Sequence, residues 1–318
     1  MELNMTSIEL ESLPKDFFKG AWKLETMIIS YNHLIEIPKE QFFYANIIKE
    51  ADYSFNDISK IDADAFIGAS ALKCLHLSHN RLKILEGHIF SYIPNLETLN
   101  ISFNAIDNLE ISTFSKLTTL LHLDLSHNGL SNIQLGTFSN QRNLLSLNLS
   151  HNFLKSIDFG LFLPRFEHLG SLIIESNELS DLDGFSRIVF PKLNAISING
   201  NHFNCSYLRK FFTSSHWSGE WIIYLRIVNN MDPKNYEKTN INGVPCDIVS
   251  DATEESAEYD DVYAGESDFI HLDKGHSAQI KAQLKVQFLY SKSTKQDKEV
   301  DYLTGHSDLR CCCFVYHK

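Results

Sequence analysis

The chain has 318 residues, 43% of them hydrophobic and 21% charged, a balance that excludes a wholly disordered or fibrous protein. No stretch approaches the roughly 18 uninterrupted apolar residues that a membrane-spanning helix needs. The net charge is −12, and the segment 247–273 holds ten acids and no Lys or Arg, so the remainder is nearly neutral. Without a basic stripe to neutralise phosphates, we expect no nucleic-acid partner.

Asparagine recurs through the first two thirds of the chain with a step of 24 residues, broken once by 25. Each of these residues closes the pattern L-x-x-L-x-L-x-x-N, and a Phe follows most of them ten residues later. The asparagines are Asn32, Asn56, Asn80, Asn104, Asn128, Asn152, Asn177 and Asn201, and the phenylalanines are Phe42, Phe66, Phe90, Phe114, Phe138 and Phe162.

This spacing predicts a solenoid of the α/β type. The two central apolar residues of each unit alternate with polar ones, so they point inward from a short strand, and successive strands stack as a parallel sheet. Asn at the turn can bond backbone groups that would otherwise be buried unpaired. One unit cannot bury its own apolar face, but stacked neighbours can. Two departures stand out: Ala51 and Tyr53 replace Leu, which predicts packing that is looser or reshaped around the Tyr, and Arg187 takes a Phe position that Phe185 or Phe190 can fill.

These units resemble the typical 24-residue class of leucine-rich repeat found in extracellular animal proteins, including Toll-like receptor ectodomains. The resemblance runs from about Leu3 to Asn201. It implies a leucine-rich repeat horseshoe with its parallel sheet on the concave face and a C-terminal cap. We expect repeats over 1–201 (about eight full units after a partial first), a cap over 202–249 and an acidic flexible tail over 250–318.

The segment after the last Asn is similar to the C-terminal caps of extracellular repeat proteins, and most of all to those of insect leucine-rich immune proteins. The resemblance implies a disulfide between Cys205 and Cys246, closing a loop of about 40 residues; two free buried thiols are the alternative. Cys74 is expected on the exposed side of its strand, without a role. Four interpretations remain for the run Cys311, Cys312 and Cys313: an interchain disulfide, lipidation, metal binding or no role.

Four N-x-S/T sequons, at Asn4, Asn100, Asn148 and Asn204, are candidate glycosylation sites if the chain is secreted. Residues 1–16 show no secretory signal, and Ile8 stands where the first unit needs its Asn. We therefore expect a truncated or incompletely predicted chain that is extracellular or secreted. A cytoplasmic protein with reduced cysteines is the alternative.

No phosphate loop, H-E-x-x-H or G-x-S-x-G pattern is present, so we expect neither an enzyme nor a cofactor or metal. His79, His127 and His151 share one position, just before the repeat Asn. A metal-binding or pH-sensing role is possible there, but an exposed position without a role explains the pattern better.

Residues expected to point outward from the strands are the candidate ligand-binding set on the concave face. Among them Tyr31, Phe55 and Phe103 form an aromatic row, which either contacts a partner or fills gaps between the units. The set is Tyr31, Asp52, Phe55, His76, His79, Phe103, His122, Asp124 and His127.

The scaffold and the lack of catalytic motifs favour a non-enzymatic protein–protein recognition module of the extracellular or cell-surface type. The resemblance implies innate immune recognition or signalling, with a protein ligand or co-receptor as partner. A structural or adhesive leucine-rich repeat protein of the extracellular matrix is the alternative.

Overall fold

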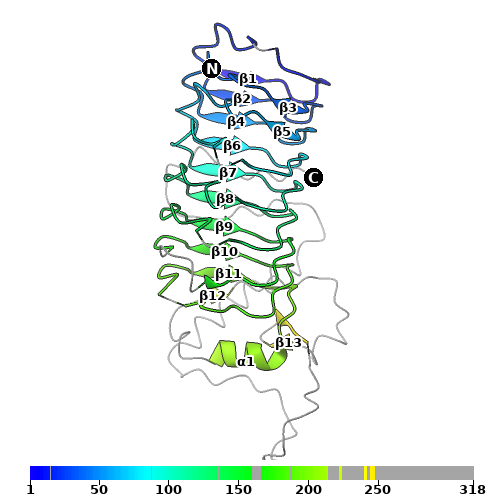
Figure 1. Cartoon of the computed structure of the whole chain (residues 1–318), viewed down its shortest axis with the longest axis vertical. Helices are drawn as coiled ribbons and strands as arrows, with labels where there is room; N and C mark the ends of the chain where they lie inside the picture. Colours follow the sequence, from blue (N-terminus) through cyan, green and yellow to red (C-terminus); the bar gives the residue numbers. More distant parts are fainter. Residues whose placement is uncertain are drawn as a thin grey trace, which may run out of the picture. The chain divides into compact units, whose positions relative to one another are not determined.

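The computed structural model describes residues 1–14, 16–86, 88–134, 136–159, 166–186, 188–213, 222–223, 240–241 and 244–247. Its main feature is a ten-stranded sheet in which every strand pairs in parallel with the strand of the next unit (Figure 1). The strands, in spatial order, are β1 (Glu2–Asn4), β2 (Thr26–Ile28), β4 (Glu50–Asp52), β6 (Cys74–His76), β7 (Thr98–Asn100), β8 (His122–Asp124), β9 (Ser146–Asn148), β10 (Ser171–Ile173), β11 (Ala195–Ser197) and β12 (Ile222–Ile223). The predicted leucine-rich repeat solenoid is confirmed.

The register of the sheet follows the repeat, so that equivalent residues lie side by side. Leu75 pairs with Leu99, Leu99 with Leu123 and Leu123 with Leu147. These middle residues are at most 3% exposed. A second, two-stranded parallel pairing joins β3 (Glu36–Ile37) and β5 (Lys60–Ile61) beside the main sheet. Burial of each such large apolar side chain is worth roughly 1.5–3 kcal/mol, and each unit supplies the cover for the next.

A column of phenylalanines fills the interior behind the sheet. Consecutive ring centroids lie 5.7–6.5 Å apart. Phe162 lies outside the described residues, and Phe166 follows Phe138 in the column. In the unit whose pattern carries Arg187, Phe190 is the fully buried member, and Phe185 packs partly buried against it at 5.1 Å. The column comprises Phe18, Phe42, Phe66, Phe90, Phe114, Phe138, Phe166 and Phe190.

Tyr53 joins this interior, as the prediction of packing around it requires. It is fully buried together with Ala51, and its ring meets Phe42 edge-on at 6.3 Å. The small Ala51 leaves room for the larger ring. The Tyr53 hydroxyl has no hydrogen-bond partner among the described residues, and burial raises its pKa. The Tyr53 hydroxyl oxygen is therefore a buried, unsatisfied polar atom in an otherwise apolar layer.

The repeat asparagines form a buried column that ties each unit to the one before it. Asn56 donates to the carbonyl oxygens of Tyr53 (3.0 Å) and Ser54 (3.2 Å) in its own unit and to that of Ile29 (3.1 Å) in the preceding unit. Its Oδ1 accepts from the Leu34 amide at 3.0 Å. Four backbone groups are thus satisfied by one side chain, which no apolar residue can do.

The same hydrogen-bonding arrangement holds the incomplete first unit. Asn32 accepts from the amides of Ile8 (3.1 Å) and Leu10 (2.9 Å) and donates to the Met5 carbonyl (2.9 Å). The first unit therefore lacks its own Asn but is bound by the Asn of its neighbour.

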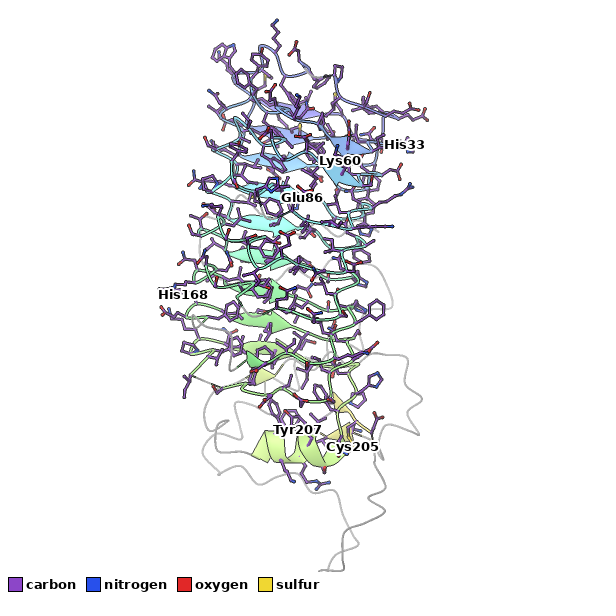
Figure 2. The ribbon with its side chains drawn as sticks, viewed as in Figure 1. His33, Lys60, Glu86, His168, Cys205 and Tyr207 are labelled. Carbon is purple, nitrogen blue, oxygen red and sulfur yellow. A yellow bond between two sulfur atoms is a disulfide. The ribbon has the colours of Figure 1, made fainter. Side chains whose placement is uncertain are left out.

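The C-terminal cap contains α1 (Cys205–Thr213) and the antiparallel pair β13 (Asn240–Ile241) and β14 (Val244–Pro245). The Cys205–Cys246 disulfide is present, with its Cα atoms 5.0 Å apart and a separation of 41 positions in sequence. Tyr207 of α1 accepts a hydrogen bond from the Leu182 amide at 2.7 Å, which ties the helix to the repeats (Figure 2). The cap also adds β12, parallel to β11, to the main sheet.

None of the described helices is long and apolar enough to cross a membrane. The predicted acidic tail, 250–318, and with it Cys311, Cys312 and Cys313, lies outside the described residues.

Candidate functional site: the strand face and its ring stack

The strand face consists of the first and third residues of β1, β2, β4 and β6 to β11, whose middle residues point into the core. It carries no Lys or Arg. Its acids are Glu2, Glu50, Asp52 and Asp124. Glu50 and Asp52 are half-buried neighbours on β4, and Asp52 Oδ1 accepts from the Ser54 amide at 2.8 Å. The face therefore offers negative charge without compensating basic groups.

Asp124 does not have the exposure expected of it. It is only 6% exposed and accepts hydrogen bonds from the Ser126 amide (2.9 Å), the Ser126 hydroxyl (2.6 Å) and Asn148 Nδ2 (3.2 Å). Burial raises the pKa of this carboxyl, and the bonds from Ser126 and Asn148 oppose the rise. In register it lies between Asn100 and Asn148, whose side chains have the same length as its own. Asp124 thus links its own unit to the next strand of the sheet by hydrogen bonds.

Cys74 is likewise buried, at 3% exposure, and the expectation that it is exposed is wrong. In register it lies between Glu50 of β4 and Thr98 of β7. Thr98 is itself only 1% exposed. Cys74 and Thr98, side by side in register, are thus both covered even though they hold outward positions on the strand face.

The two strand-face histidines are half-buried. His122 Nδ1 lies 2.9 Å from the Ser146 hydroxyl, and burial lowers the pKa of its ring. His76 pairs in register with Asp52 on one side and Asn100 on the other. Of the two rings, His122 thus has a hydrogen-bond contact at the surface of the sheet.

Six aromatic rings stack in an unbroken row beyond the C-terminal ends of the strands. Neighbouring centroids are 3.9–4.2 Å apart, and the planes are within 12° of parallel. Each of the five ring pairs is worth about 0.5–1.5 kcal/mol beyond its buried area. This ring stack is formed by Tyr31, Phe55, His79, Phe103, His127 and His151.

Each residue of the ring stack has a left-handed backbone, with φ between 52° and 57°. Such a conformation costs a bulky residue about 1–3 kcal/mol and persists only where its surroundings impose it. Here hydrogen bonds between units impose it: the His79 amide donates to the Ser102 carbonyl at 3.0 Å, and the Asn80 amide donates to the Phe103 carbonyl at 3.2 Å. The strained turn holds each ring over the next.

The ring stack remains partly open to solvent. Tyr31 is 43% exposed, His151 is exposed and the four rings between them are half-buried. Burial lowers the pKa of His79. Burial, followed by the charges that His151 and His79 would carry, lowers the pKa of His127 to about 4. At neutral pH the middle of the stack is uncharged.

The aromatic row and the three histidines were predicted as separate features. The structure joins them, because all six share the position before the repeat Asn. His151, left out of the candidate ligand-binding set, is the last ring. The signal for it was the shared offset. No group of three His, Cys, Asp or Glu side chains in the described residues is arranged to hold a metal ion.

The four sequons share one local geometry. In each, the Asn Oδ1 accepts hydrogen bonds from the amide and the hydroxyl of the Ser or Thr two residues on. They differ in access. Thr6 and Ser206 are exposed, whereas Ser102 and Ser150 are about 5% and 4% exposed. The sequons at Asn4 and Asn204 thus have an exposed Ser or Thr, whereas those at Asn100 and Asn148, in the middle of the sheet, have a buried one.

Profiles of two leucine-rich repeat families match the chain: the general leucine-rich repeat at 54–106 and 94–154, and a BspA-type leucine-rich repeat region over 2–73. Together with the fold, these matches make the chain a leucine-rich repeat protein. No curated protein sequence matches it.

Among solved structures, one similar chain comes from the crystal structure of a TLR13–ssRNA13 complex. Its TM-score is 0.58 and its identity is 24%, over 64% of this chain and 32% of that one. The chain thus spans about a third of the TLR13 chain. At this identity the likeness shows the shared fold.

Proposed function

We propose that the chain is a non-enzymatic recognition module that binds a protein partner through its strand face and ring stack. One observation carries the proposal: six rings, each at least partly exposed, stack along one edge of a face that bears acids and no Lys or Arg. Aromatic side chains are enriched at interface hot spots, and stacked rings are already ordered, so a partner does not have to immobilise them. Repeat surfaces of this kind serve as extended binding surfaces.

The charge of the strand face favours a protein over a nucleic acid. TLR13 was crystallised with single-stranded RNA. In the present chain, the strand face offers no Lys or Arg to neutralise phosphates, while Glu50 and Asp52 would repel them. We therefore propose a protein ligand or co-receptor with a complementary, basic character.

We place the module outside the cell, in recognition of the innate immune type. The Cys205–Cys246 disulfide supports this, because such bonds persist in oxidising compartments. Asn4 and Asn204 are the proposed glycan acceptors, since their sequons are open. Asn148 already donates its Nδ2 to Asp124 at 3.2 Å, which opposes a sugar at that atom. Deglycosylation followed by intact-mass measurement of the secreted protein checks this assignment.

The binding proposal is tested by matched charge reversals. The double variant Glu50→Lys, Asp52→Lys changes the strand face, and the control Glu86→Lys, Asp107→Lys makes the same charge change at exposed residues outside it. Each variant is immobilised, exposed to extracellular fluid of the source organism, and its retained proteins are quantified by mass spectrometry.

We expect a protein that the wild type and the control retain equally and that the strand-face variant retains at least tenfold less. Equal loss from both variants overturns the proposed face. Tight binding of a single-stranded RNA oligonucleotide, weakened by neither variant, overturns the choice of a protein partner.

A further inference from the structure

The ring stack stops at His151, although the backbone that supports it continues. The equivalent residues of the next two units are Ser176, with φ 54°, and Gly200, with φ 67°. The His151 amide donates to the Glu175 carbonyl at 2.9 Å, and the Ser176 amide donates to the Asn199 carbonyl at 2.7 Å, so the units stay in register. Among the described residues, no seventh ring covers the outer face of His151.

The missing rings leave room for one planar group. Neighbouring strands lie about 4.8 Å apart, so two units without a ring leave about 10 Å along the stack. His151 stacks on His127 at 4.0 Å, and a planar group at the same spacing fits over its other face. A Cβ on Gly200 would lie 3.0 Å from the Ser176 hydroxyl oxygen, so that unit has little room for a ring of its own. We call this space beside His151 the stack-end slot.

The residue that follows the repeat Asn is apolar in the unit of His151 and acidic in the next unit. Leu154 donates its amide to Asn177 Oδ1 at 3.1 Å, and Glu178 donates its amide to the Leu154 carbonyl at 2.9 Å. These bonds bring the turn that carries Phe153 against the turn that carries Glu178. Phe153 is 56% exposed, and half-buried Glu178 has no ion-pair partner among the described residues.

We propose that the stack-end slot receives the guanidinium group of an arginine from the protein partner. A guanidinium is planar, so it stacks on an aromatic face, and its N–H donors can pair with Glu178. A lysine ammonium can pair but cannot stack, and an aromatic side chain can stack but leaves Glu178 unpaired. Charge complementarity agrees, because β9, β10 and β11 carry no Lys or Arg. This assignment rests on the proposed protein-binding function and names the chemistry of its partner.

The test uses the full chain and three short probe peptides, acetyl-Gly-Arg-Gly-amide and its lysine and citrulline counterparts. Binding is followed by NMR of the histidine ring C–H signals, with His88, exposed and outside the ring stack, as internal reference. We expect the arginine peptide to shift the His151 signal saturably and to bind at least fivefold more tightly than the lysine peptide, which lacks the planar group. The citrulline peptide, planar but uncharged, should also be at least fivefold weaker. Equal affinities for the three peptides overturn the proposal.

Three variants locate the binding. Ser176→His adds the missing ring on a backbone that already has the required φ, so it should fill the slot and weaken the arginine peptide at least tenfold. Ser176→Ala, the matched control, should leave its affinity unchanged. Glu178→Gln should reduce the preference for arginine over citrulline to less than twofold. Unaltered arginine binding by Ser176→His overturns the slot.

The outcome is separable from that of the proposed function, because the peptides require no natural partner. A slot that fails to bind arginine leaves the strand-face experiment intact. A strand face that retains no protein, beside a slot that binds arginine, overturns the protein partner alone.

Discussion

The asparagine column and the ring stack occupy adjacent residues in six successive units, yet they differ in burial, variety and consequence. Each Asn from 32 to 152 is buried or nearly so and bonds the same set of backbone groups. Each residue just before it is a ring, of three different kinds, and is at least partly exposed. At the Asn position, hydrogen bonding to the backbone requires one kind of side chain. At the position before it, stacking requires only a ring, so several kinds of side chain occur.

The largest effect should come from the asparagine column. Asn128→Ala leaves the carbonyl oxygens of Ile101, Leu125 and Ser126 and the Ile106 amide without their partner. At roughly 1 kcal/mol for each lost bond, we expect a loss of about 4 kcal/mol in the free energy of unfolding, measured by urea denaturation.

The control for this prediction is Asn140→Ala. Asn140 is exposed and makes one hydrogen bond, to the Ser115 carbonyl at 2.9 Å, so the expected loss is under about 1 kcal/mol. Similar losses in the two variants would mean that the buried asparagines contribute no more to the free energy of unfolding than an exposed one.

The ring stack should tolerate change better, and in an unusual order. Phe103→Ala removes stacking on both neighbours, at 4.1 and 3.9 Å, and keeps a side chain on a left-handed backbone. Phe103→Gly loses the same stacking but relieves the strain. We expect losses of about 2 kcal/mol for Ala and about 1 kcal/mol for Gly. Denaturation of both variants measures the difference, and a Gly variant less stable than the Ala variant contradicts the role given to strain.

A buried polar group without partners sharpens the contrast with Asn. Tyr53 is as deeply buried as the asparagines, but its hydroxyl is unsatisfied among the described residues. Tyr53→Phe should therefore raise the free energy of unfolding by about 1 kcal/mol. Tyr92→Phe is the matched change at an exposed hydroxyl that bonds Asp64 at 3.2 Å, and it should give no gain. A loss of stability in Tyr53→Phe would show that the hydroxyl does find a partner.

Periodicity predicted the parts of the molecule that depend on a fixed offset. The asparagine column, the parallel strands and most of the phenylalanine column each repeat with the unit, so one pattern locates them all. Phe190 was one of two alternatives because Arg187 interrupts that pattern, and only packing distinguishes Phe190 from Phe185.

The strand face was predicted less well. The position of a residue within the repeat predicts which way its side chain points, but not whether neighbouring side chains bury it. Asp124 and Cys74 do stand at outward positions, but the side chains of adjacent strands bury them. The neighbours that flank them in register are 24 residues away in sequence. The ring stack was only half predicted for a related reason: Phe and His were considered by chemical type, whereas stacking depends on shape and position.

The smallest expected effect is the response of the ring stack to acid. The pKa of His127 in the folded chain, about 4, lies below the ordinary value of 6.5, so between these values the unfolded chain binds a proton that the folded chain does not. Stability is therefore complete above pH 6.5 and falls as the pH drops toward 4. Solvent screening of the half-open ring limits the loss to under about 1 kcal/mol. His127→Phe keeps the stack and removes the titration, so between pH 7 and pH 5 its thermal midpoint should fall less than that of the wild type. Identical falls would place the acid sensitivity elsewhere in the chain.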